Sequence, residues 1–412
     1  MNKQLIPVLL GADLNCYNVA RAFHEAYGVI SYAFGRYAIS ATKYSRIVRF
    51  TAVPDMEDEA VLLKTLTDFA DAHPDAKLVL FACTDDYAAM MIRLKDKLPR
   101  YIAPCPPAHL LDSISKKAEF YDICQKYGIP YPATHVLTEA AAESDLTEEK
   151  LGFAYPIVVK PSSSVDYWKH PFDGMKKVYF ANTPAEAAAI VSEIYSAGYP
   201  EKMILQETIP GGDAHMRVLT AFSDKNGKVR AMCLGHTMIE EHTPKGLGNH
   251  AAIVTEPITA LPFADKIRAM LEDLGYTGFS NFDIKFTGKD GDYRTFEINL
   301  RQGRSNFYVT SSGINIARLA AEVYESDGDD CVFPKKPHFW HLVPRSVAYT
   351  YTEDADLIAA AKALAKNGED TSSLFYKPDL MWNPMRLICV LEVLRRQKQK
   401  FKKYYPKKSQ QF

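Results

Sequence analysis

The sequence predicts a protein that combines an α/β part with α+β parts, and three observations carry this prediction. Residues 5–98 alternate short apolar runs with helical patterns, which is typical of a small parallel sheet. Residues 216–301 contain paired apolar runs joined by glycine-containing turns, which favour antiparallel hairpins. Between these regions Gly128 ends a helical pattern and Pro130 and Pro132 follow it, which indicates a domain boundary.

Composition is that of an ordinary soluble globular chain. Its 412 residues are 47% hydrophobic and 24% charged, which allows sizeable cores in more than one domain. The formal net charge of −1 argues against a nucleic-acid-binding protein. The apolar run near the start is too short for a signal peptide or a membrane span, and the seven cysteines form no CxxC pair. We therefore expect reduced thiols, no zinc cluster and a cytoplasmic location.

The N-terminal region is predicted to alternate strands and helices. Residues 5–10 predict a buried strand, followed by a turn and a helix that extends through residue 26. A second buried strand at residues 78–83 precedes a helix at residues 87–98. Ligands usually bind at the carboxyl ends of parallel strands. Substrate contact and ordinary helix capping are both open for the polar residues at these ends, Asp13, Asn15, Asp85 and Asp86.

A lysine is expected at the end of the next buried strand. After a helix at residues 115–127, residues 155–161 predict an apolar strand that carries Lys160 and is followed by Ser162, Ser163 and Ser164. A lysine beside small hydroxylated residues suits a nucleotide phosphate, because its charge and the loop donors can follow the phosphate oxygens. A lysine that snorkels beside a flexible turn is the alternative.

A strand and a hinge follow a helix predicted at residues 183–197. Residues 203–213 predict a strand that ends at Pro-Gly-Gly. Such a hinge can present backbone donors and acceptors to an adenine edge, with Glu207 or Asp213 near the ribose hydroxyls. A hairpin across the turn signal Asn226-Gly227 comes next, and a helix is predicted at residues 262–274.

A second hairpin gathers the strongest chemical signal. Residues 281–286 and 295–301 alternate strictly, and a loop of five residues centred on Asp290 places Asp283 opposite Glu297. The two faces then differ: Asp283, Lys285, Glu297 and Asn299 share one, and Phe282, Ile284, Phe286, Phe296, Ile298 and Leu300 share the other.

The polar face of this hairpin suits a magnesium ion. Two carboxylates and an amide oxygen on a rigid hairpin are what Mg²⁺ requires when substrate phosphates complete its shell. Arg301 and Arg304 follow directly and can bind phosphate oxygens bidentately. An ordinary amphipathic hairpin with a solvated charged face is the alternative.

Taken in order, these motifs resemble the ATP-grasp carboxylate-amine ligases over about residues 5–320. The wording around residues 216–219, 232–236, 276–279 and 296–305 is similar to one group in particular, the D-aspartate ligases of Gram-positive peptidoglycan synthesis. The motifs that carry the resemblance are Lys117-Ala-Glu-Phe120, Gly128-Ile-Pro130, Tyr155-Pro-Ile-Val-Val-Lys160-Pro161, Gln206-Glu-Thr-Ile-Pro210-Gly211, Asp283 and Glu297-Ile-Asn-Leu-Arg301.

The resemblance implies a three-part ATP-grasp fold with a C-terminal extension. Its parts are an N-terminal pre-ATP-grasp (Rossmann-like) parallel sheet, a mobile lid and a catalytic domain built on an antiparallel sheet. In this chain they correspond to residues 1–112, 113–205 (with a linker helix) and 206–322, and the extension to residues 323–412.

The resemblance also implies roles for residues. Lys117, Lys160, Ser162, Ser163 and Lys177 would bind the phosphates of ATP. The adenine hinge would consist of Gln206, Glu207, Thr208 and Ile209, with Asp213 beyond it. Mg²⁺, or Mn²⁺ in its place, falls to Asp283, Glu297 and Asn299. Stabilisation of the acyl phosphate falls to Arg217, Arg301 and Arg304. Two departures concern the phosphate loop, which has few glycines, and Asp283, which stands where many relatives have glutamate.

The implied activity is ATP-dependent ligation through an acyl phosphate. By resemblance, the side-chain carboxyl of D-aspartate is joined to the lysine side-chain amine of a UDP-MurNAc-peptide, a cell-wall precursor. Another amino acid and amine pair, or a nucleotide-binding module without chemistry, are the alternatives.

The C-terminal region carries a concentrated positive charge. A helix is predicted near residues 355–367. Residues 385–408 contain nine cations against the single acid Glu392, with apolar residues interleaved. Such a basic amphipathic helix either lies on an anionic membrane surface or packs its apolar side on the ligase body.

Overall fold

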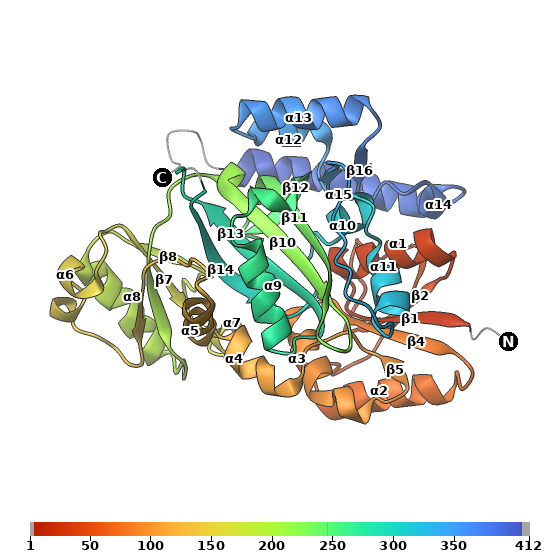
Figure 1. The fold of residues 1–412 in the computed structure, drawn as a ribbon, viewed down its shortest axis with the longest axis horizontal. Helices are drawn as coiled ribbons and strands as arrows, with labels where there is room; N and C mark the ends of the chain where they lie inside the picture. The colour runs from red at the N-terminus through yellow and green to blue at the C-terminus, as the bar shows by residue number, and fades with distance from the viewer. Residues whose placement is uncertain (1–3, 245, 290, 406–412) are drawn as a thin grey trace.

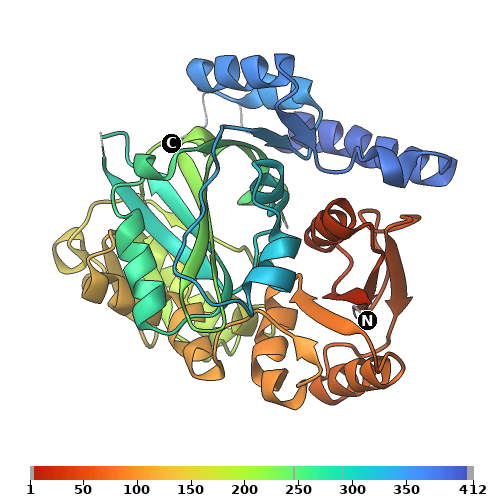
Figure 2. The same cartoon turned by 45° about the vertical axis from the view of Figure 1, so that its right-hand side comes forward.

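The strands in the described part of the chain form three sheets. The computed structural model describes residues 4–244, 246–289 and 291–405. Figures 1 and 2 show the N-terminal sheet at one end of the molecule, a small sheet at the other end and the largest sheet between them. The C-terminal helices lie across the largest and the N-terminal sheets (Figure 2). Lys407 and Lys408 of the predicted basic segment lie outside the described residues.

The N-terminal sheet is parallel, as predicted. Its strand order is β3-β2-β1-β4-β5, and the central strands β1 and β4 are the most apolar and most deeply buried. The strands are β1 (Leu5–Leu10), β2 (Ser31–Gly35), β3 (Val48–Ala52), β4 (Lys77–Ala82) and β5 (Tyr101–Ile102). The helices between them are α1 (Leu14–Tyr27), α2 (Glu59–Asp71) and α3 (Asp85–Leu94), and a short 3₁₀ turn (Lys95–Lys97) continues α3.

Capping residues set where two of these helices begin. The carboxylate of Asp13 accepts a hydrogen bond from the backbone of Cys16 at the start of α1. The hydroxyl of Thr84 accepts one from Tyr87, so Thr84 caps α3 and Asp85 and Asp86 lie in its first turn. Helix α3 therefore starts two residues earlier than predicted. Because β1 and β4 are neighbours, these two helix starts meet at one edge of the sheet.

The small sheet is reached through the predicted linker helix. Helix α5 (Lys117–Tyr127) follows α4 (Leu111–Ser115) and ends at Gly128, whose φ of 64° is the left-handed conformation that favours glycine. The sheet has the antiparallel order β6-β9-β7-β8. Its elements are β6 (Thr134–Leu137), α6 (Glu148–Leu151), β7 (Ile157–Pro161), α7 (Ser164–Tyr167), β8 (Tyr179–Ala181), α8 (Pro184–Ser196) and β9 (Met203–Glu207). We call residues 134–207 the lid sheet.

The largest sheet has seven strands in the order β14-β13-β10-β11-β12-β15-β16, of which only β15 and β16 pair in parallel. Helix α9 (Ala264–Asp273) covers one face, and α10 (Phe307–Ser311) and α11 (Ile316–Arg318) lie at the other (Figure 1). The strands are β10 (Met216–Ser223), β11 (Val229–Glu241), β12 (Asn249–Glu256), β13 (Gly278–Phe286), β14 (Tyr293–Asn299), β15 (Phe339–His341) and β16 (Asp370–Ser372). We call this the central sheet.

Four helices end the described chain: α12 (Arg345–Tyr351), α13 (Ala355–Lys366), α14 (Lys377–Leu380) and α15 (Pro384–Tyr404). The predicted helix near residues 355–367 is confirmed by α13. Helix α15 buries Val390 and Phe401 against the body, while Ile388 and Leu391 on its other side are exposed. No helix within the described ranges is long and apolar enough to cross a membrane.

Candidate active site

The β13–β14 hairpin holds the predicted carboxylate pair. Asp283 lies opposite Glu297 and Asn281 opposite Asn299, so the predicted pairing of Asp283 with Glu297 is confirmed. The polar residues of these pairs share one face of the central sheet, because directly opposed side chains point to the same side. Two carboxylates are thereby held side by side on a rigid support.

The register shifts immediately beyond this pair, which corrects one prediction. Ile284 pairs with Thr295, so Phe296 falls between the two pairs as a bulge. Phe296 therefore does not join the buried core of Phe282 and Ile284. It is only partly buried, and the Nζ of Lys160 lies 5.4 Å from its ring centroid. The bulge turns this aromatic ring toward the site.

Lys117 pairs with one of the two carboxylates. It is the first residue of α5, and its Nζ lies 2.8 Å from Oε2 of Glu297. The hydroxyl of Ser162 accepts a hydrogen bond from the backbone of Ala118, which fixes the start of α5 against the end of β7. Although burial alone would raise the pKa of Glu297, Lys117 and Lys177 lower it below its ordinary value. Glu297 is therefore an anion held among cations.

Lys160 is the most deeply placed cation of the site. Its Nζ donates to Oε1 of Gln206 at 2.9 Å and to the hydroxyl of Tyr121 at 3.2 Å. Burial, with the nearby charges of Lys117 and Lys177, lowers the pKa of Lys160 to about 7. The snorkelling alternative does not hold, because this side chain points inward and is buried. An anion placed here would restore the charged form of the lysine.

The other carboxylate has a histidine partner that sequence reasoning missed. Nε2 of His250 lies 3.4 Å from Oδ1 of Asp283, and its Nδ1 lies 3.2 Å from Glu240 and 2.9 Å from the hydroxyl of Thr237. Burial disfavours a charged imidazole, but the contacts with Asp283 and Glu240 raise the pKa of His250 to about 10. Burial raises the pKa of Asp283. Polar residues alternate along β11 and β12, and this pattern could have indicated His250. Using it would have required knowing which strands pair.

The phosphate-loop serines hold the local backbone. The hydroxyl of Ser163 caps α7 by accepting from the backbone of Asp166, and it donates to the carboxylate of the same residue. The backbone N–H of Ser163 donates to the hydroxyl of Tyr199. Lys177 is exposed and acts on Glu297 and Lys160 through its charge. The serine contacts fix the segment that follows β7, and Ser162 at its start also contacts α5.

Hydrogen bonds to neighbouring segments hold the hinge residues 206–209 in place. Gln206 donates to the hydroxyl of Thr134, and Thr208 donates to the carbonyl of Pro156. The carboxylate of Glu207 accepts a hydrogen bond from the backbone N–H of Ala133. The carbonyl of Ile209 accepts one from Nζ of Lys285. Lys285 links the hinge after the lid sheet to the carboxylate face of the central sheet.

Arg217 is placed differently from the prediction. Val218 pairs with Asp283, so Arg217, its neighbour in β10, points to the opposite face of the central sheet. There its Nε lies 2.8 Å from Oε2 of Glu256, which also contacts His236. We therefore remove Arg217 from the groups expected at the reacting atoms, because strand alternation sets its direction.

Both carboxylate oxygens of Asp213 have polar partners. Its oxygens accept from the backbone of Glu240 at 2.8 Å and from the hydroxyl of Tyr405 at 3.0 Å, and His242 lies 3.0 Å away. These contacts join the hinge to β11 and to the residue that follows α15. The structure thus gives Asp213 an anchoring role that the sequence did not suggest.

Arg301 connects the segment after the hairpin to the N-terminal sheet, and Arg304 connects it to β11 of the central sheet. Arg301 Nε lies 2.8 Å from Asp85, and Arg304 lies 3.2 Å from Glu241. Burial raises the pKa of Asp13, and the charges of Arg304 and Arg301 oppose that shift. The two arginines therefore gather at the same sheet edge as Asp13 and Asp85, beside the carboxylate hairpin.

Asn15 has a structural role at this junction. Its amide nitrogen donates to the carbonyls of Cys83 and Gln302, and its oxygen accepts from Gln302 and Asn306. This fully buried network fastens the N-terminal sheet to the segment after β14. The substrate-contact alternative is thus not favoured for Asn15.

The donor set on the hairpin fits a magnesium ion. Within the described ranges no group of three His, Cys, Asp or Glu side chains converges on one point. Asp283 and Glu297 supply two hard oxygens, and Asn299 lies on the same face. Two opposed carboxylates repel each other unless cations separate them, and His250 and Lys117 do so here. A divalent ion with phosphate ligands suits this set.

Comparison with known proteins agrees with the fold. No protein-family model matches the chain. The chain is 37% identical over 395 residues to a D-aspartate ligase of Enterococcus faecium (strain Aus0004), which covers 92% of each. It is 26% identical over 212 residues to the carbamoyl phosphate synthase large chain of Methanocorpusculum labreanum, covering 50% of this chain and 18% of that one.

Solved structures share the same arrangement of sheets. An L-amino acid ligase from Bacillus licheniformis superposes with a TM-score of 0.55 at 15% identity, covering 79% of this chain and 75% of that one. An N5-carboxyaminoimidazole synthetase from Staphylococcus aureus, complexed with ADP, superposes with a TM-score of 0.59 at 14% identity and covers 82% of each chain. These proteins are similar to this chain in fold.

Proposed function

Because this chain belongs to the D-aspartate ligase family, we propose that it joins the side-chain carboxyl of D-aspartate to the lysine side-chain amine of a UDP-MurNAc-peptide. The chain is an ATP-dependent carbon–nitrogen ligase with the ATP-grasp fold. One observation carries the proposal for the site: Lys117 and Lys160 of the lid side converge on the Asp283–Glu297 face of the central sheet.

ATP is proposed to bind between the lid sheet and the central sheet. Lys117, Lys160 and Lys177 supply charge to its phosphates, and the backbone of residues 206–209 faces the adenine. Ser162 and Ser163 support this site by fixing the segment that follows β7, which carries Lys160, against the start of α5, which carries Lys117. Glu207 remains the candidate for the ribose, since Asp213 is engaged elsewhere.

Magnesium is proposed to bind at Asp283, Glu297 and Asn299. When bound there, Mg²⁺ supplies charge neutralisation for the transferring phosphoryl group. His250 contacts Asp283 through Nε2 and thereby helps to orient its carboxylate. Lys117 holds Glu297 ionised, so the carboxylate is ready for a cation at neutral pH.

The chemistry proceeds in two steps. A carboxylate oxygen of the amino acid attacks the terminal phosphorus of ATP, which forms an acyl phosphate and releases ADP. The amine nitrogen then attacks the acyl carbon, the carbon–oxygen bond to phosphate breaks and the nitrogen loses a proton. Arg301 and Arg304 lie where they can stabilise the negative oxygens in both steps. A lid closed over the site keeps water from the acyl phosphate.

Phosphate release tests this proposal. D- and L-amino acids are screened with a lysine-containing UDP-MurNAc-peptide, and Glu297→Gln serves as the inactive control. We expect release with D-aspartate that depends on both ATP and the peptide. Activity with a different amino acid would retain the ligase and overturn the D-aspartate assignment. No release with any pair would overturn the catalytic proposal in favour of a binding module.

The parts of the chain and their location complete the proposal. We assign residues 1–112, 113–205, 206–322 and 323–412 to the pre-ATP-grasp, lid, catalytic and C-terminal parts, although the boundary after residue 205 falls inside β9. A cytoplasmic enzyme in peripheral contact with the inner face of the membrane, through residues 385–408, suits a substrate that leads to the cell wall.

A further inference from the structure

An exposed apolar surface lies at the turn between α14 and α15. Trp382 is 83% exposed and Ile388 is 61% exposed, which is unusual for side chains of this size. We call the exposed apolar side chains of this region the turn surface: Tyr44, Met381, Trp382, Met385, Ile388 and Leu391.

The backbone at two of these residues is held in an unfavourable conformation. Within the described ranges the non-glycine residues with positive φ are Tyr44 (60°), Asp55 (54°) and Trp382 (58°). The left-handed conformation is unfavourable for an aromatic residue and persists only where its surroundings impose it. Asn383 joins the two aromatic sites, because its side-chain amide donates to the carbonyl of Tyr44 at 2.8 Å.

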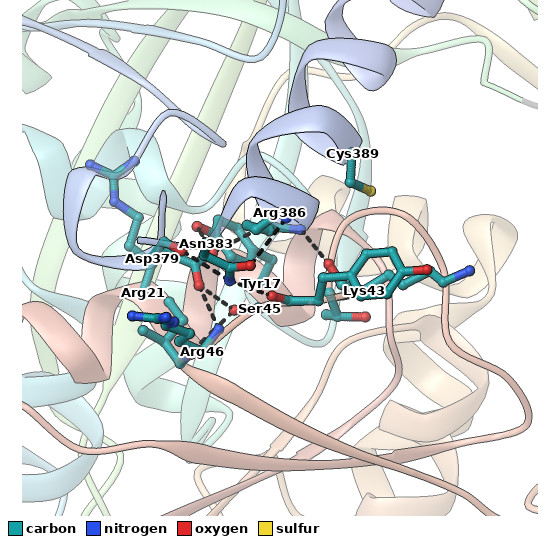
Figure 3. A network of polar contacts seen from close by, with 12 residues as sticks. Tyr17, Arg21, Lys43, Ser45, Arg46, Asp379, Asn383, Arg386 and Cys389 are labelled. Atoms are coloured by element: carbon teal, nitrogen blue, oxygen red, sulfur yellow. Dashed lines mark hydrogen bonds and ion pairs between the residues drawn. The ribbon is translucent and has the colours of Figure 1, made fainter. Parts of the chain in front are cut away.

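Arg46 and a buried network impose this conformation. Arg46 donates to the carbonyl of Trp382 at 2.6 Å and to that of Met381 at 3.2 Å. Beneath them, Figure 3 shows Asp379 accepting hydrogen bonds from several elements at once. Its partners are Tyr17, Ser45, the backbone of Arg46 and Arg386, with the Arg386 Nε 2.8 Å from the carboxylate. The exposed position of Trp382 is thus built into the fold.

The turn surface continues directly into a row of cations. Ile388, Leu391 and Arg395 follow each other at intervals of three and four residues, so they lie along one side of α15. Lys398 and Lys402 extend this side at similar intervals. Glu392, the acid of α15, is paired with both Arg395 and Arg396. The exposed side of the helix therefore changes from apolar to positive along its length.

We propose that the turn surface inserts into an anionic phospholipid surface while the cations of α15 contact the lipid phosphates. This deepens the membrane contact proposed above and assigns it to particular residues. The charge pattern favours lipid over protein, because lysine is depleted in protein interfaces whereas basic residues beside exposed tryptophan and aliphatic groups are typical of membrane-surface helices. Arg386 and Val390 face the body and take no part.

Tryptophan fluorescence gives the first test. Trp340 is buried and Trp168 is exposed at the lid, so a lipid-induced change at Trp382 can be separated by substitution. Vesicles of phosphatidylcholine mixed with phosphatidylglycerol should shift the emission of the full chain to shorter wavelength. The shift should persist in Trp168→Phe and disappear in Trp382→Phe. A shift that persists in Trp382→Phe would overturn the assignment.

Vesicle pelleting with matched variants gives the second test. Ile388→Ser with Leu391→Ser should weaken binding by at least about tenfold, since it removes apolar area from the lipid contact. Lys398→Gln with Lys402→Gln should weaken it by a similar factor, because each surface cation contributes about 1 kcal/mol, or roughly fivefold. Val136→Ser with Phe180→Ser, which removes exposed apolar groups from the lid sheet, should leave binding unchanged.

Two results would overturn the proposal, and neither bears on catalysis. Equal binding to vesicles of phosphatidylcholine alone would contradict the role of the cations. Dimerisation that Ile388→Ser with Leu391→Ser abolishes, without vesicle binding by the full chain, would identify the turn surface as a contact between copies. Ligase activity on soluble substrates is measured in parallel and should be the same in all variants, so that failure here is distinguishable from failure of the proposed function.

Discussion

Lys117 and Glu297 form an ion pair across the junction between the linker helix and the β13–β14 hairpin, with 2.8 Å between Nζ and Oε2. A lysine suited to phosphate thus neutralises a carboxylate suited to metal. The two charges compensate each other where both side chains are largely buried. Binding of ATP with Mg²⁺ would separate the two, since each group then gains a stronger partner.

Removing the charge of Glu297 should abolish turnover without unfolding the protein. We expect Glu297→Gln to lower phosphate release by at least about a hundredfold, because a proposed metal ligand and the counter-charge of Lys117 are lost together. Far-UV circular dichroism should be unchanged. Glu149→Gln, which removes an exposed carboxylate of the lid, is the matched control and should retain full activity. Undiminished turnover in Glu297→Gln would contradict the proposed metal site.

Nucleotide binding should take up a proton at mildly alkaline pH. Since the pKa of Lys160 is lowered to about 7, this lysine is largely neutral at pH 8 in the free protein. Bound phosphates favour its charged form and raise its pKa, so binding takes up a proton and affinity falls as pH rises above about 7.

Calorimetry in buffers of different ionisation enthalpy measures this uptake directly. We expect close to one proton at pH 8 in the native protein and in Lys97→Met, whose lysine is exposed. Lys160→Met should lose most of the uptake. Identical uptake in the two variants would show that another group titrates.

Arg217 and Arg301 should differ in what their loss affects. Arg217→Ala leaves Glu256 and His236 without a buried cation, and we expect it to lower the free energy of unfolding by about 2–4 kcal/mol while the folded enzyme keeps its kcat. Arg301→Ala should lower kcat with a smaller effect on stability. Urea denaturation measures the stability of both variants, and steady-state kinetics measure their kcat. A large loss of kcat in Arg217→Ala would contradict the placement of Arg217 on the opposite face of the central sheet.

The Asp379–Arg386 pair should be a main anchor of the C-terminal helices. Both side chains are fully buried, so Arg386→Ala leaves a buried carboxylate unpaired and should cost about 3–5 kcal/mol. Limited proteolysis should then cleave near α15 first. Arg395→Ala, which breaks an exposed pair on the same helix, should cost well under 1 kcal/mol. Equal effects of the two substitutions would contradict the anchoring role.

The sequence predicted the parts of the fold that depend on local pattern. Strand β1, helix α5 and the opposition of Asp283 to Glu297 follow from apolar periodicity and turn signals, and all three are observed. The bulge at Phe296 was not predictable, because an extra residue in one strand leaves no mark in an alternating sequence. The position of the bulge depends on the pairing with β13 and on the packing of Phe296 against Lys160.

The parts of the site that depend on pairing between distant strands were missed. His250 reaches Asp283 only because β12, β11, β10 and β13 lie in that order, which no local pattern specifies. The register that pairs Val218 with Asp283 likewise turns Arg217 away from the site, and the local sequence does not specify that register. The α15 segment shows a similar limit, since its amphipathic pattern predicted either burial or exposure of its apolar residues, whereas Val390 is buried and Ile388 is exposed.

Helix α15 restricts which parts of the enzyme can move. Near its start Arg386 donates to the carbonyls of Ser40 and Lys43 beside the N-terminal sheet, and further along Gln397 donates to Glu241 at the end of β11. Because α15 is attached to both sheets, it prevents them from separating or rotating independently. The catalytic cycle should therefore involve two bodies, with the lid sheet swinging against everything else. Distances between fluorophores on the N-terminal and central sheets should stay constant through turnover, while those to the lid change.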